Sequence, residues 1–342
     1  MPSILDVDPY LLSILLKVVL ALAFFLVIPL VVGYIEHKVL AHMQARLGPM
    51  EAIWHGTGQL IADGIKFIQK EDVTPRAADK WVFALAPGVS LVPVLVIIAV
   101  LPLGPGLWLA DLDAGLLFAL AGSSVGVLGI LMAGWASANK YSLMGGLRSA
   151  GQLIAYELPL VIAAVTVALQ AETLSLVGIV EAQHEFRLFD TVPVPYAVPQ
   201  IVGLALFFVA ALAELNRPPF DMPIGDSELV FGFMTEYTGI KYAFFMLSEY
   251  AGMVVLSALA TVLFLGGWYP WPGVDVPEGA LGVLVGFVIT LAKILVLTVI
   301  MVWLRATFPR LREDQLQRMS WLVLIPLALV QVIVVAIAKV VA

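Results

Sequence analysis

Eight long apolar segments run through this chain, and they restrict its fold more than any other feature does. A helix that crosses a bilayer needs about 20 mostly apolar residues, because lipid offers no hydrogen bonds to the backbone. Segments of this kind lie at roughly 10–35, 81–103, 114–138, 156–179, 197–215, 242–266, 281–304 and 320–341. The sequence therefore predicts an all-α polytopic membrane protein with eight transmembrane helices in a single membrane domain, residues 1–342.

Composition agrees with this class and excludes others. The chain is 61% hydrophobic and 13% charged, whereas soluble domains are about 45–50% apolar and about 25% charged. A net charge of −7 leaves no basic face for nucleic acid. The absence of Cys rules out thiolate-ligated clusters in this chain, and no nucleotide-binding motif is present. We therefore expect no metal and no redox cofactor of its own.

Basic residues indicate the topology. Lys and Arg gather in the loops that follow the first, third, fifth and seventh apolar segments. Loops that retain Lys and Arg stay in the cytoplasm. The pattern predicts that these loops are cytoplasmic and that both termini lie outside.

A segment after the first span has a different pattern. In residues 51–70, Gln59, Asp63 and Lys66 share one helical face while apolar residues such as Leu60 and Ile65 share another. This pattern predicts an amphipathic helix that lies in the interface plane on the cytoplasmic side. It is either a plain connector or the wall of a cavity that opens at this surface.

Four glutamates lie within or at the end of apolar segments, all toward the predicted cytoplasmic side. Glu36 ends the first segment, Glu157 lies just inside the fourth, Glu214 lies near the end of the fifth and Glu249 lies about two turns into the sixth. A charge at a helix centre costs roughly 2.5–3.5 kcal/mol on insertion scales, so such residues are functional candidates. Their clustering at one face predicts a chamber that handles protons or a ligand.

Structural ion pairs are the alternative explanation for these charges. Glu36 would then pair with Lys38 or Arg46, and Glu157 with Arg148. Lys293 lies deep in the seventh segment. It would be either a proton relay or the counter-ion of a buried glutamate.

The loop at about 216–241 is the most unusual stretch. It is rich in acids, including Asp221, Asp226 and Glu228, and its prolines prevent a continuous helix. Residues such as Phe220 are too apolar for a solvated acidic loop, which is the alternative. We therefore expect an ordered loop that docks a partner, with Arg217, Phe220 and Asp221 in it.

Four blocks of sequence together resemble the quinone-chamber membrane subunit, the H subunit, of bacterial NADH:quinone oxidoreductase, respiratory complex I. They are EHKVLAHMQARLGP (36–49), GTGQLIADGIKFIQKED (56–72), the stretches AELNRPPFD, GDSELVFGFMTEY and FFMLSEYAGM within 213–253, and WLRATFPRLREDQLQRMSW (303–321). The resemblance covers about residues 30–325, nearly the whole chain.

The resemblance implies a membrane subunit that forms much of a chamber for a quinone, ubiquinone or menaquinone, and couples its reduction to proton translocation. It implies partners: hydrophilic subunits that carry the terminal iron–sulfur cluster, and antiporter-like and small membrane subunits. It assigns Glu36, Arg46, Asp63 and Lys66 to quinone binding and Glu157, Glu214, Asp226, Glu228 and Glu249 to a proton relay. Four positions, His37, Ala41, Ile224 and Asp226, depart from the family pattern.

Other functions stay open from the sequence. Related subunits serve complexes fed by ferredoxin or F420H2 and membrane-bound hydrogenases. A stand-alone proton or cation carrier would also have acid-lined helices, but it needs no apolar docking loop. A pure membrane anchor leaves the carboxylates in the spans unexplained.

Overall fold

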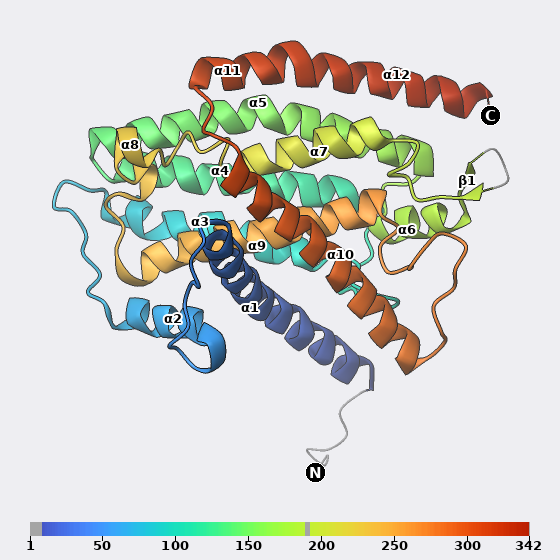
Figure 1. Cartoon of the computed structure of the whole chain (residues 1–342), viewed down its shortest axis with the longest axis horizontal. Helices are drawn as coiled ribbons and strands as arrows, with labels where there is room; N and C mark the ends of the chain where they lie inside the picture. Colours follow the sequence, from blue (N-terminus) through green and yellow to red (C-terminus); the bar gives the residue numbers. More distant parts are fainter. Residues whose placement is uncertain (1–8, 189–191, 342) are drawn as a thin grey trace.

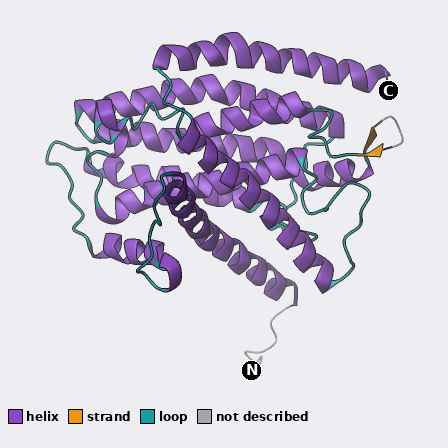
Figure 2. Ribbon diagram, viewed as in Figure 1, coloured by secondary structure: helices purple, strands orange, loops and turns teal. Residues whose placement is uncertain are grey.

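The computed structural model describes residues 9–188 and 192–341, and these are almost entirely helical (Figures 1 and 2). The longer helices are α1 (Pro9–Met43), α3 (Lys80–Ile98), α4 (Gly115–Ala136), α5 (Lys140–Ala171), α7 (Ile201–Glu214), α9 (Gly239–Phe264), α10 (Ala280–Thr307) and α12 (Ile325–Val341). The shorter elements are α2 (Gln59–Gln69), α6 (Leu176–Glu185), α8 (Asp226–Leu229), α11 (Glu313–Met319), single turns at Trp54–Gly56 and Gly232–Met234, and a small hairpin of β1 (Arg187–Leu188) and β2 (Val192–Pro193).

Seven of the described helices are long and apolar enough to cross a membrane, which confirms a polytopic helical protein. The last of them joins α11 to α12 through a π-helical turn, Ser320–Leu324. The remaining predicted span, the fifth at 197–215, corresponds to α7, which has only 14 residues. At 1.5 Å per residue α7 covers about 21 Å, less than the roughly 30 Å of a hydrocarbon core. The count of eight therefore stays a prediction.

Helix α9 is the centre of the bundle. In its most apolar window 78% of the residues are buried, against 17% for the helix at the C-terminal end. Helices α1, α3 and α10 all contact α9, and so does the short helix α2. Figure 1 shows α2 and α8 at one end of the bundle, and α6 and β1 at the other. We call these the α2/α8 end and the α6 end.

Both ends of α5 differ from the predicted ones. The fourth span is predicted at 156–179, but α5 begins at Lys140, where the Asn139 side chain accepts a hydrogen bond from the Tyr141 amide, and it ends at Ala171. The first turns of α5 look like a loop in sequence because they are small and polar. They are small because Gly134 of α4 lies against Ser142 and Gly146.

The predicted amphipathic segment 51–70 is helical only from Gln59. Ile53 and His55 have positive φ angles (56° and 54°), which no continuous helix accommodates. Its interfacial role stays a prediction.

Candidate functional site

Glu36 lies at the centre of a buried cluster of charges. The residue is 1% exposed. Arg217 donates from Nη1 to Glu36 Oε2 at 2.5 Å, and Arg305 of α10 donates from Nη1 to Glu36 Oε1. Both carboxylate oxygens of Glu36 are thus held by guanidinium groups from distant parts of the chain.

Arg217 extends the cluster to α9. Its Nε lies 2.8 Å from Oε1 of Glu249, and its guanidinium carbon lies 4.7 Å from the centre of the Tyr250 ring. The cluster therefore combines two carboxylates with two guanidinium groups and has no formal net charge. Pairing with opposite charges offsets the cost of burying these ions, although Nε and Nη2 of Arg217 have no hydrogen-bond partner in the described part of the chain.

The turn that carries Arg217 is held by α5. The side-chain amide of Gln152, which is 1% exposed, lies 2.7 Å from the carbonyl oxygens of both Ala213 and Phe220. The same nitrogen lies 3.2 Å from Oδ1 of Asn216. Because these acceptors lie on both sides of Arg217, Gln152 fixes the path of the backbone from which the guanidinium group reaches Glu36.

Glu214 and Glu157 form a second group, linked by serines of α4. The Ser123 hydroxyl hydrogen-bonds the Glu214 side chain, and the Ser124 hydroxyl donates to Oε1 of Glu157. Within the described part of the chain, Oε2 of Glu214 is buried and has no hydrogen-bond partner. The predicted pairing of Glu157 with Arg148 is not found, because Arg148 contacts other carboxylates.

A cavity of about 110 Å³ connects the two groups. Glu214 and Glu249 both line it, together with Ser90, Ser123 and Ser248. The Ser248 hydroxyl donates to the Ser90 carbonyl oxygen at 2.9 Å. A volume of this size with several polar partners can hold water. Five residues thus follow one another through the bundle, and we call them the carboxylate row: Glu36, Arg217, Glu249, Glu214 and Glu157.

Helix α2 lies beside the end of this row at which Glu36 and Arg217 lie. A Cβ on Gly33 of α1 would lie 2.8 Å from Leu60 of α2 and 3.6 Å from Tyr250 of α9, so the three helices meet closely there. On α2, Lys66 donates to Asp63 at 3.0 Å, and the Lys66 side chain is 59% exposed.

Arg46 does not meet Glu36, so the ion pair named as an alternative for these two residues is not found. Helix α1 continues to Met43, and the chain then turns at Ala45 and Gly48, which both have positive φ. Arg46 is exposed after this turn and donates to Gln44 at 2.8 Å.

Lys293 lies away from the carboxylate row. Its ammonium group donates to the carbonyl oxygens of Leu265 (2.6 Å), Gly267 (3.0 Å) and Tyr269 (2.6 Å). It therefore satisfies three carbonyls of the turn that follows α9. The interpretation of Lys293 as the counter-ion of a buried glutamate is wrong, because its three protons are used here.

The predicted docking loop divides into buried and exposed parts. Phe220 is 4% exposed and packs edge-on against Tyr156 of α5 at 5.4 Å, so it belongs to the core of this chain. Asp221 is half-buried, and the side chain of Asp226 lies outside the described part. Val230 and Phe231, by contrast, are 59% and 43% exposed.

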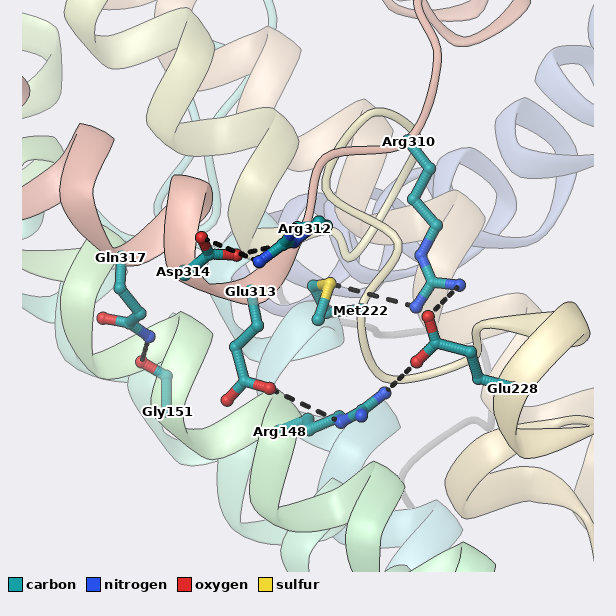
Figure 3. A network of polar contacts seen from close by, with 9 residues as sticks. All are labelled: Arg148, Gly151, Met222, Glu228, Arg310, Arg312, Glu313, Asp314 and Gln317. Atoms are coloured by element: carbon teal, nitrogen blue, oxygen red, sulfur yellow. Dashed lines mark hydrogen bonds and ion pairs between the residues drawn. The ribbon is translucent and has the colours of Figure 1, made fainter.

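Glu228 joins this loop to neighbouring elements (Figure 3). Arg148 of α5 lies 2.7 Å from Oε2 of Glu228 and 3.6 Å from Glu313 of α11, and Arg310 lies 3.8 Å from Oε1 of Glu228. The hydrogen bond from Arg148 and the charge of Arg310 hold the pKa of the Glu228 carboxyl below its ordinary value.

Sequence reasoning missed several members of the site. Arg305 and Tyr250 complete the cluster around Glu36, and Ser123, Ser124 and Gln152 support the carboxylates. The serine pair in an apolar helix and the Tyr that follows Glu249 were signals in the sequence. Nothing in the sequence indicated that Gln152 of α5 would hydrogen-bond the turn around Arg217.

Comparisons with known proteins identify the family. A family model described as NADH dehydrogenase matches residues 16–336. The chain belongs to this family. It is similar to the NADH-quinone oxidoreductase H subunit numbered 1 of Geobacter sulfurreducens, with 41% identity over 95% of this chain and 94% of the relative. It is also similar to the NADH-quinone oxidoreductase H subunit of Brevibacillus brevis, with 45% identity over 89% of this chain and 86% of the relative. The resemblance seen in the sequence is thereby confirmed.

Proposed function

We propose that this chain is the membrane subunit of a proton-pumping NADH:quinone oxidoreductase in which quinone reduction is coupled to proton translocation. Membership of the family and the names of the relatives support the complex and its NADH donor. The carboxylate row is the single observation that carries the coupling role. The electrons would come from cofactors on the hydrophilic subunits, and the last of these cofactors would be the terminal iron–sulfur cluster.

Eight crossings of the bacterial inner membrane, with both termini outside, fit this role. Helix α7 would be the fifth crossing, completed by the turns at 196–200 that precede it. Helix α2 would lie in the interface plane, since Ile61, Ile65 and Ile68 are 55%, 53% and 70% exposed. An apolar face of this kind is stable against acyl chains.

The quinone mouth would lie where α1, α2 and α9 meet. There the apolar face of α2 can follow an isoprenoid tail, while the half-buried Asp63 and the exposed Lys66 and Arg46 can meet the polar headgroup. Glu36 would act from behind this surface, through its ion pairs. The exposed Val230 and Phe231 give the loop an apolar patch to dock the hydrophilic subunits.

Charge balance explains how the row would work. Reduction of a quinone to a quinol takes up two electrons and two protons, so negative charge develops in the chamber before the protons arrive. A new negative charge would compete with Glu36 and Glu249 for Arg217, the cation that both share. A carboxylate that loses its cation binds a proton more readily. Glu249, Glu214 and Glu157 would pass this change along, through the cavity and the Ser123–Ser124 pair.

Substitution of the row in the intact complex tests the proposal. We expect Glu249→Gln and Glu157→Gln to lower quinone-linked turnover and proton pumping together, measured in proteoliposomes with assembly checked on native gels. Glu228→Gln, on the exposed loop, should have a milder effect. Glu181→Gln, an exposed glutamate of α6, is the matched control and should behave as the unmodified complex does.

If the Glu249→Gln and Glu157→Gln complexes both pump at the unmodified stoichiometry, the row is structural and the coupling proposal is wrong. If they fail to assemble, Glu157→Asp provides a second variant. It keeps a titratable group, and the proposal requires it to retain more pumping than Glu157→Gln.

A further inference from the structure

A second cavity lies away from the carboxylate row, and nothing above uses it. It has a volume of about 310 Å³ and lies between α1, the segment 98–109 and the first turns of α10. Thirteen of its fourteen lining residues are apolar, and the exception is Lys17. None of its lining residues belongs to α2 or α9, so it is separate from the proposed quinone mouth.

The walls of this cavity are built by close helix contacts. On α1 the lining residues Lys17, Leu20, Phe24 and Val27 repeat at helical spacing, so they form one stripe. Phe24 meets Phe287 of α10 edge-on at 6.5 Å. Large apolar cavities without polar partners stay dry and bind apolar molecules.

Aromatic residues place the cavity near a membrane surface. Trp108 lines it and stacks on Trp268 at 6.1 Å, near the end of α9. Trp is enriched where hydrocarbon meets the headgroups. Lys17 lies eight residues into α1, or about 12 Å along the helix, and a long Lys side chain can extend toward the headgroups from this depth. The cavity therefore opens at the α6 end of the bundle.

Lys17 has no internal counter-ion in the described chain. Among the side chains and backbone groups that the structure describes, none is a hydrogen-bond or ion-pair partner of its ammonium group, although the side chain is partly buried. A cation in such surroundings is costly unless an anion reaches it. Basic side chains near a membrane surface attract the phosphates of anionic lipid headgroups.

We propose that this cavity binds one anionic phospholipid from the leaflet at the α6 end, with an acyl chain in the apolar cavity and the phosphate against Lys17. The charge of Lys17 distinguishes this occupant from others. A quinone is neutral and would leave the ammonium group unpaired. A zwitterionic lipid would place its own cation close to Lys17 and bind less well.

Photolabelling of the purified complex tests the site. The probe is phosphatidylglycerol with a photoreactive group on its acyl chain, and labelled peptides are identified by mass spectrometry. We expect labelling within 17–28 and 98–109 that unlabelled phosphatidylglycerol displaces better than phosphatidylcholine does. Lys17→Gln should lower this labelling about fivefold, the effect of one lysine near a lipid phosphate. Ala21→Phe, which places an aromatic ring inside the cavity and blocks an acyl chain, should abolish it.

The matched control is Lys339→Gln. Lys339 is a cation at the same end of the bundle that pairs with Glu172 at 3.0 Å and lines no part of this cavity. Its removal should leave labelling unchanged. Equal labelling of the Lys17→Gln and unmodified complexes would overturn the proposal, as would equal displacement by the two lipids. Labelling of these peptides by a photoreactive quinone in preference to the lipid would also overturn it.

Discussion

Removal of Arg217 should damage the chain more than removal of any other cation near the carboxylate row. Arg217 is 1% exposed and serves two carboxylates, Glu36 at 2.5 Å and Glu249 at 2.8 Å. Met in its place keeps an unbranched side chain and removes the charge. Glu36 would then retain Arg305, but Glu249 would lose its cation.

The structure allows the size of the effect to be worked out. Breaking a buried ion pair by removing one partner costs about 3–5 kcal/mol, because the other charge stays buried and uncompensated. Arg305→Met should cost less, about 1.5 kcal/mol, since the Arg305 side chain is 35% exposed and Arg217 still holds Glu36. In the double variant Arg217→Met with Glu249→Met the unpaired carboxylate is gone, so we expect about 1–3 kcal/mol of coupling between the two sites.

Heat inactivation of the purified complex measures these differences as rates. Each 1.4 kcal/mol corresponds to a factor of about ten, so a loss of about 3–5 kcal/mol in Arg217→Met should shorten the half-life of the assembled complex by a factor between roughly 100 and roughly 4,000. The double variant should regain at least a factor of about five of this loss. The reasoning is refuted if Arg217→Met inactivates no faster than Arg305→Met, or if the effects of the substitutions at 217 and 249 simply add.

Three further predictions concern the predicted site residues. Lys293→Met should lower stability by about 1–3 kcal/mol, because carbonyls at the end of α9 lose their donor. The number of protons pumped per electron in proteoliposomes should not change. A changed ratio would mean that Lys293 takes part in the proton relay after all. Glu228 has a lowered pKa, so its contribution to holding α8 is present above its ordinary pKa of 4.5 and is lost as the pH falls through the lower folded value. Hydrogen exchange of 226–229 should therefore differ between Glu228→Gln and the unmodified chain at about pH 6, and the difference should vanish in acid. Phe220→Ala should cost about 3–5 kcal/mol and reduce the amount of folded chain. Phe231→Ala should leave the chain folded but weaken attachment of the hydrophilic subunits, as judged by co-purification.

The sequence by itself determined the class, the family and the positions of the acids within the apolar spans. Runs of about 20 apolar residues require helices in a membrane, since the backbone has no other way to satisfy its hydrogen bonds there. A carboxylate within such a run is visible without any structure, which is why Glu157, Glu214 and Glu249 could be named in advance. The four blocks around them were specific enough to indicate the family.

Only the tertiary structure decided which charges meet. The sequence suggested near neighbours as counter-ions, Arg46 for Glu36 and Arg148 for Glu157. The residues that hold Glu36 are instead 181 and 269 positions away, Arg217 and Arg305. Helical periodicity fixes the direction in which a side chain leaves its own helix, but it says nothing about which helix packs on that side. Packing at close contacts, such as Gly33 against Leu60 and Gly134 against Gly146, brings distant helices together and so selects the ion pairs.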